Sequence, residues 1–180
     1  IKGPLKLLLC GKIVDFSLLP FGAVLNSDTM KYAEIPESQA IRRVVTIENK
    51  ANFMSASYEE DVLYIFTHGF FAPRERAFLR QLNQALKQTD VEYLHSGDLD
   101  YGGIRIYQNI QKNVFPELQP YLMDAVTFQE FSSEVIPKDK AYLDKLKKMD
   151  VPTELEELKA CILKAGGIIE QESMLGWNIT

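Results

Sequence analysis

Apolar and polar positions divide the chain into two parts with different patterns. Residues 1–40 carry short apolar stretches interrupted by glycine and proline, which predicts a small extension or linker of antiparallel strands. From residue 41 onward, apolar runs of strand length alternate with helical stretches. This alternation produces a parallel sheet covered by helices. We therefore expect an α/β domain over residues 41–180, built on a mainly parallel sheet of about four strands flanked by helices.

Four apolar runs are the candidate strands of that sheet. They cover residues 44–47, 62–66, 91–94 and 125–128. Each is short and bounded by polar residues, glycine or proline, as buried strands of a parallel sheet usually are.

Helical spacing of apolar residues predicts the connections between these strands. Strong patterns cover residues 73–86, which open with proline, and residues 104–114, and a weaker one covers 49–58. The charge-dense segment 137–172 contains two further helical patterns, separated by Val151-Pro152, with Thr153 as the expected N-cap of the second. We expect these helices to close the C-terminal end of the domain.

Composition and charge narrow the class of protein. The chain has 180 residues, of which 46% are hydrophobic and 25% charged, as in ordinary folded domains. Lys and Arg number 20 against 25 Asp and Glu, a net charge of −5, which argues against a protein that coats DNA through general positive charge. The two cysteines, Cys10 and Cys161, lie far apart, so neither a zinc finger nor a disulfide framework is indicated.

The sequence also bears on cellular location. Its apolar runs are far shorter than the roughly 20 residues that a membrane-spanning helix needs, so we expect no membrane span. The chain starts at Ile1 without a Met or a secretory leader. These features favour a fragment of a longer cytoplasmic protein.

Carboxylates follow two of the predicted strands at the point where each strand ends. Glu48 follows the first strand, and Asp98 and Asp100 follow the third. Because parallel strands present their carboxyl ends at one edge of a sheet, we expect these side chains to lie close together, with Leu99 turned into the core. Clustered carboxylates repel one another unless a hard divalent cation lies between them. The pattern therefore predicts a site for Mg²⁺ or Mn²⁺.

Simpler interpretations of the same residues remain open. Asp100 precedes Gly102 and Gly103, so the Asp pair also fits a turn followed by an N-cap, in which the glycines form a tight turn into the next helix. A single glutamate at the end of a strand, such as Glu48, is usually a solvated surface residue.

Basic and polar side chains near the same edge are candidates for contact with phosphate. Lys50 lies two residues after Glu48, and Arg105 lies close behind the glycine pair, while Arg74 and Arg76 begin another helix. Surface solvation is the simpler alternative for each. His68 follows the second strand and is either a general acid or base or a structural histidine.

Three sequence blocks resemble one known family. They read TIENKANF from residue 46, HSGDLDYGGIRI from residue 95 and GGIIEQESM from residue 166. The glutamate of the first and the Asp-x-Asp of the second resemble the Toprim pattern. Together the blocks resemble the C-terminal Toprim domain of the JetD family, nuclease subunits of bacterial Wadjet anti-plasmid systems, which is itself similar to the A subunits of type IIB topoisomerases.

The resemblance implies a Toprim-like fold and a metal-dependent endonuclease acting on double-stranded plasmid DNA. It implies that Glu48, Asp98 and Asp100 hold Mg²⁺ or Mn²⁺, and that Glu170 and Glu172 complete a second metal site or orient water. The alternative for the last two is exposure in a charged segment. It further implies SMC-like defence subunits as partners, and a homodimer formed through an N-terminal region that this chain lacks.

Two other hypotheses remain. In one, the same fold is a non-catalytic module that binds DNA or a protein partner. In the other, the protein transfers phosphate on small molecules with Asp98 as nucleophile. The sequence gives the second little support, because such enzymes usually carry a threonine where this chain has Gly102.

Overall fold

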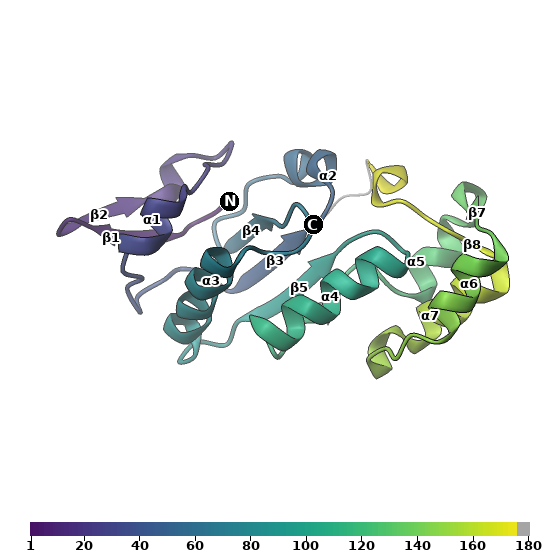
Figure 1. Ribbon diagram of the computed structural model, residues 1–180. Helices are drawn as coiled ribbons and strands as arrows, with labels where there is room; N and C mark the ends of the chain where they lie inside the picture. The colour runs from purple at the N-terminus through teal and green to yellow at the C-terminus, as the bar shows by residue number, and fades with distance from the viewer. Residues whose placement is uncertain (176–180) are drawn as a thin grey trace.

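A parallel sheet of four strands forms the centre of the protein. The computed structural model describes residues 1–175, and the sheet has the strand order β4-β3-β5-β6 (Figure 1). Its strands are β3 (Arg43–Ile47), β4 (Val62–Phe66), β5 (Glu92–Ser96) and the short β6 (Gln119–Pro120). All neighbouring pairs are parallel, which confirms the predicted α/β class.

Helices cover both faces of the sheet. Figure 1 shows α3 (Pro73–Leu86) and α4 (Tyr101–Asn113) on one side and α2 (Lys50–Ser55) on the other. Successive residues of a strand point to opposite faces, so Val44 joins the core under α3 and α4, whereas Val45 packs in a second cluster with Phe53 of α2. The sheet is therefore buried on both faces, as its near-continuous apolar strands predict.

The prediction of a strand at residues 125–128 is wrong. This segment is helical, α5 (Ala125–Glu130), and the Asp124 side chain accepts a hydrogen bond from the Thr127 amide to cap it. A four-residue, mainly apolar run fits either a strand or a buried helical turn, and here the N-cap formed by Asp124 favours the helix. The fourth strand of the sheet, β6, has only two residues and includes a proline, so it carries no apolar pattern.

Two helices follow near the C-terminal end of the described chain, as predicted. They are α6 (Lys140–Lys147) and α7 (Glu156–Ala165). A 3-10 turn over Thr153–Leu155 precedes α7, so Leu155 and not Thr153 occupies its N-cap. The remaining short elements of this region are η2 (Ser132–Glu134), β7 (Ile136–Pro137), β8 (Gly167–Ile168), which pairs antiparallel with β7, and η4 (Gln171–Met174).

The N-terminal segment forms the predicted antiparallel strands. These are β1 (Lys6–Leu9) and β2 (Lys12–Asp15), followed by the 3-10 turn η1 (Phe16–Leu18) and the short helix α1 (Ser27–Tyr32). Figure 1 shows this hairpin at the β4 side of the molecule, opposite α6 and α7. Lys2 pairs with Tyr64 of β4, and Leu5 and Leu7 are buried in the main core. The segment thus covers the outer edge of β4, which would otherwise expose unpaired backbone groups.

The predicted division at residue 40 stays a prediction. The predicted domain over residues 41–180 reaches past the described chain, because residues 176–180 lie outside it. Within residues 1–175, no helix is both long and apolar enough to cross a membrane.

Candidate functional site

The ends of β3 and β5 bring Glu48 and Asp98 together. The two strands lie side by side with Ile47 opposite Ser96, and the Asp98 amide donates a hydrogen bond of 3.3 Å to Oε2 of Glu48. A β-carbon at Gly97 would lie 2.7 Å from the same oxygen. A larger residue at this position would therefore displace the Glu48 carboxylate from its place beside the Asp98 loop.

The carboxylates at this edge perturb one another. Burial, followed by the charges of Asp98 and Asp100, raises the pKa of Glu48 from 4.5 to about 7, against a lowering by the hydrogen bond from the Asp98 amide. Burial also raises the pKa of Asp98, with a contribution from the charges of Asp100 and Glu170. Neighbouring carboxylates that raise one another's pKa are stabilised by a cation between them. The structure thus brings the three predicted carboxylates into one electrostatic group.

Asp100 also caps the helix that follows it. Its Oδ1 accepts a hydrogen bond of 2.7 Å from the Gly103 amide, so the N-cap interpretation is correct for one oxygen of this side chain. The helix begins at Tyr101, which places the glycine pair inside its first turn and not in a turn before it. A β-carbon at Gly103 would lie 2.1 Å from the Asp98 carbonyl oxygen, and this close approach explains the glycine. Leu99 is fully buried, as expected.

The oxygen-only donor set suits a hard divalent cation in an open site. Within residues 1–175, no three His, Cys, Asp or Glu side chains are grouped closely enough to hold a metal ion by themselves. Protein-bound Mg²⁺ often takes only one or two carboxylates and completes its shell with water and substrate phosphate. Glu48, Asp98 and Asp100 fit that kind of site. Metal binding by these residues stays a prediction.

Gln171 is a residue of this site that the sequence analysis did not single out. It is 1% exposed and lies between Glu170 and Glu172, which are both exposed. Its backbone amide donates to Oδ1 of Asp98 at 2.7 Å, and its side chain contacts the ends of both β3 and β5. The one sequence feature that could have indicated Gln171 is its place as a neutral residue between two glutamates in the block GGIIEQESM. Its contacts are with residues distant in sequence, which the block itself does not reveal.

His95 lies beneath the same edge as a neutral imidazole. It is fully buried, and burial lowers its pKa to about 3. Its Nδ1 lies 2.9 Å from the Thr46 hydroxyl, whereas its Nε2 has no hydrogen-bond partner among the described residues. A β-carbon at Gly97 would lie 3.0 Å from this Nε2. A larger side chain at residue 97 would therefore crowd the imidazole as well as the Glu48 carboxylate.

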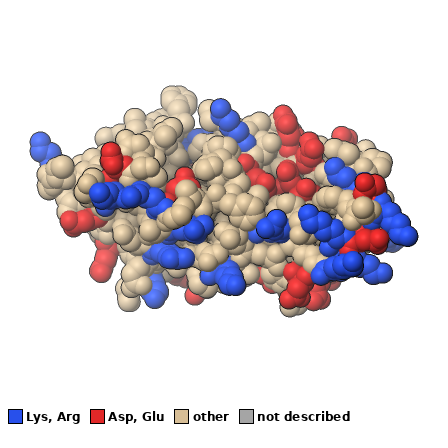
Figure 2. Space-filling view, in the orientation of Figure 1, with Lys and Arg blue, Asp and Glu red and all other residues tan. Residues whose placement is uncertain are grey.

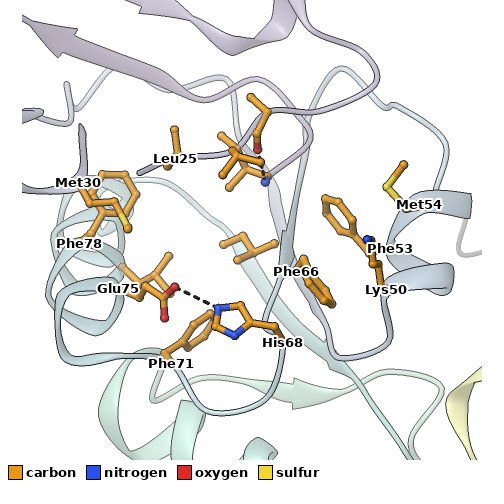
Figure 3. A pocket seen from close by; sticks show the side chains of 15 residues that line it. Leu25, Met30, Lys50, Phe53, Met54, Phe66, His68, Phe71, Glu75 and Phe78 are labelled. Atoms are coloured by element: carbon orange, nitrogen blue, oxygen red, sulfur yellow. Dashed lines mark hydrogen bonds and ion pairs between the residues drawn. The ribbon is translucent and has the colours of Figure 1, made fainter. Parts of the chain in front are cut away.

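Lys50 and His68 line a separate, mainly apolar cavity of about 460 Å³. Figure 3 shows Lys50 and Phe53 on one side of it and Phe78 of α3 on another. Nε2 of His68 lies 3.1 Å from Oε1 of Glu75, also drawn in Figure 3. This contact with Glu75 supports the structural interpretation of His68, and the phosphate-binding role of Lys50 stays a prediction.

Arg105 is exposed on α4 and rests on two aromatic rings. Its guanidinium carbon lies 5.4 Å from the centre of the Phe70 ring and 5.8 Å from that of Tyr101. Lys145 of α6 lies 4.1 Å from the Tyr101 ring centre. Cations are attracted to the faces of aromatic rings, so these side chains hold two positive charges beside Asp100. By contrast, Arg76 in the first turns of α3 donates a hydrogen bond to the Phe71 carbonyl in the loop before this helix.

Comparison with known proteins assigns the chain to a family. Residues 9–179 match the family described as "Wadjet protein JetD, C-terminal". A similar protein is the Wadjet protein JetD of Bacillus cereus (strain Q1), which is 33% identical over 154 residues. That match covers 83% of this chain and 36% of the relative, so the chain spans little more than a third of the relative's length. The chain belongs to the JetD C-terminal family.

Proposed function

We propose that this chain is the nuclease part of a Wadjet anti-plasmid system and hydrolyses phosphodiester bonds of double-stranded DNA with Mg²⁺ or Mn²⁺. The observation that supports this most is the group formed by Glu48, Asp98 and Asp100 at one sheet edge in a member of the JetD family. The relative's name refers to the Wadjet system. SMC-like partner subunits, a homodimer through further N-terminal regions and a cytoplasmic location belong to the same proposal.

The proposed hydrolysis needs no nucleophilic side chain from the protein. A bound divalent cation lowers the pKa of a water ligand and neutralises charge on the phosphate. The three carboxylates would hold that cation. Because burial and the neighbouring carboxylates raise the pKa of Glu48 to about 7, its carboxyl takes up a proton as the pH falls through neutrality in the metal-free protein. That proton competes with the cation, so we expect activity to rise as the pH increases through neutrality.

The positive charges beside the site suit the DNA backbone. Arg105 and Lys145 are both exposed and lie over aromatic rings next to the start of α4. Figure 2 shows acidic and basic side chains close together on the face that carries α4 and α6. In this arrangement, acids hold the cation while neighbouring basic groups contact phosphates on either side of the scissile bond.

Plasmid cleavage by the complete protein and its complex tests the proposal. With Mg²⁺ or Mn²⁺, Asp98→Ala is expected to lower the cleavage rate by a factor of about a thousand, the scale of losing a charge-stabilising group. Asp144→Ala on α6, which removes an exposed acid, is the matched control. Cleavage at the normal rate by the Asp98→Ala protein would refute the proposal.

A non-catalytic binding module is the second candidate. The observation that favours it is that the carboxylates of the described chain do not form a closed metal cage. In that case Asp98→Ala would leave plasmid protection in cells unchanged. Arg105→Ala combined with Lys145→Ala would abolish it. The nuclease proposal expects Asp98→Ala to abolish protection.

A further inference from the structure

Gln171 uses all of its polar groups to join segments that are distant in sequence. Its side-chain oxygen accepts a hydrogen bond from the Asn49 amide at 2.8 Å, and its side-chain nitrogen donates to the Ser96 hydroxyl at 2.7 Å. Its backbone amide donates to Asp98 at 2.7 Å, and its carbonyl accepts from the Asn52 side chain at 3.1 Å. With 1% exposure, the residue is a fixed part of the interior.

These bonds reach both loops that carry the candidate metal ligands. Asn49 directly follows Glu48 at the end of β3, and Ser96 lies two residues before Asp98 at the end of β5. The Gln171 side chain therefore spans the gap between the two strand ends. Its backbone amide at the same time orients the Asp98 carboxylate.

The segment that carries Gln171 is itself firmly anchored. Leu99 and Ile169 exchange backbone hydrogen bonds of 2.9 and 3.4 Å, and Ile169 is fully buried. Met174, at the end of the same segment, is 3% exposed. The segment is therefore packed into the core on both sides of Gln171, and the Gln171 hydrogen bonds connect it to the sheet edge.

An amide is the side chain that this position requires. It offers an acceptor to the Asn49 amide and a donor to the Ser96 hydroxyl, and it adds no negative charge to a group of carboxylates that already repel one another. Residues that hydrogen-bond to metal-binding side chains and so orient them usually have a strong effect on metal affinity.

We propose that Gln171 is a positioning residue that holds the Glu48 loop and the Asp98 carboxylate at the separation at which both bind one divalent cation. This inference rests on the proposed function, because it presupposes that the carboxylates bind metal. It goes beyond that function by assigning the geometry of the site to a neutral residue from the C-terminal segment.

Calorimetric titration of the full chain with Mn²⁺ at neutral pH tests this role. Gln171→Met keeps the side-chain length and both backbone bonds but removes both side-chain bonds, and it is expected to weaken Mn²⁺ binding by about tenfold or more. Gln111→Met is the matched control, since the Gln111 amide also bonds to several groups, but near Leu118 and Glu154. The control is expected to lower the melting temperature without changing Mn²⁺ affinity.

The outcomes separate positioning from general stability. A lower melting temperature with unchanged Mn²⁺ affinity in Gln171→Met would overturn the inference. If that variant does not fold, Ser96→Ala removes only one of the bonds and is expected to weaken Mn²⁺ binding by about threefold, the effect of one neutral hydrogen bond. Unchanged affinity there would also overturn the inference.

Failure of the proposed function has a different signature. In that case the unmodified protein does not bind Mn²⁺ at all, and the inference fails with it. Failure of the inference alone requires that the unmodified protein and Gln171→Met bind Mn²⁺ equally well. Faster hydrogen exchange of the Asn49 amide in Gln171→Met is the expected accompanying sign that the loop is released.

Discussion

Replacing Glu48 with Gln is expected to remove a pH-dependent loss of stability from the metal-free protein. Burial and the neighbouring carboxylates raise the pKa of Glu48 from 4.5 to about 7 in the folded state. Below pH 4.5 the carboxyl is protonated in both the folded and the unfolded state. As the pH rises from there through 7, the folded protein binds more protons than the unfolded chain, so its stability falls. A glutamine keeps the acceptor for the Asp98 amide but cannot ionise.

The size of this effect follows from the two pKa values. The difference between 4.5 and about 7 corresponds to about 3 kcal/mol if it acts in full, since one pKa unit is worth about 1.4 kcal/mol. Glu48 is only partly buried, so solvent screening lowers the expected contribution to about 1–2 kcal/mol. We therefore expect Glu48→Gln to exceed the unmodified protein in unfolding free energy by about this amount at alkaline pH, and to show little difference in acid.

Urea denaturation followed by circular dichroism measures this difference. Both proteins are unfolded in the presence of a chelator at several values from about pH 4 to about pH 8, a range that spans the titration. Glu130→Gln, which neutralises an exposed carboxyl at the end of α5, is the control and is expected to follow the unmodified protein. Parallel stability curves for Glu48→Gln and the unmodified protein over the whole range would refute the reasoning, because Glu48 would then titrate alike in both states.

Three further substitutions test the packing of the site and its support. Gly97→Ala places a β-carbon 2.7 Å from Oε2 of Glu48; it is expected to lower the unfolding free energy by about 1–3 kcal/mol in urea denaturation and to weaken Mn²⁺ binding in calorimetry. Gly103→Ala meets the Asp98 backbone carbonyl oxygen at 2.1 Å, which cannot move aside as a side chain can, so we expect a larger loss of about 3 kcal/mol or more by the same denaturation assay. Lys2→Met leaves three carbonyl groups at the end of α2 without their buried ammonium donor, and a drop of about 1–3 kcal/mol in the unfolding free energy is expected.

The sequence predicted the central strands of the sheet and the placement of Glu48 and Asp98 at one edge, because both follow from local pattern and one topological rule. Apolar runs followed by helical spacing define β3 and β5, and parallel strands then place Glu48 and Asp98 at one edge. The helix at residues 125–130 was missed because a mainly apolar run of four residues does not distinguish a strand from a helical turn. Gln171 was missed for another reason. Its role consists entirely of contacts with residues far away in the chain, which no local pattern encodes.

Backbone amides stabilise part of the negative charge that Glu48, Asp98 and Asp100 bring to this edge of the sheet. Among the described residues, each of the three carboxylates accepts a hydrogen bond from a backbone amide: Glu48 from Asp98, Asp98 from Gln171 and Asp100 from Gly103. Each bond engages one carboxylate oxygen and fixes the direction of the group. The amides stabilise the negative charges without neutralising them, and burial, together with repulsion from Asp98 and Asp100, still raises the pKa of Glu48. A proton on Glu48 relieves that repulsion in the free protein. A divalent cation would relieve it more completely, and for this reason we expect cation and proton to compete at this edge of the sheet.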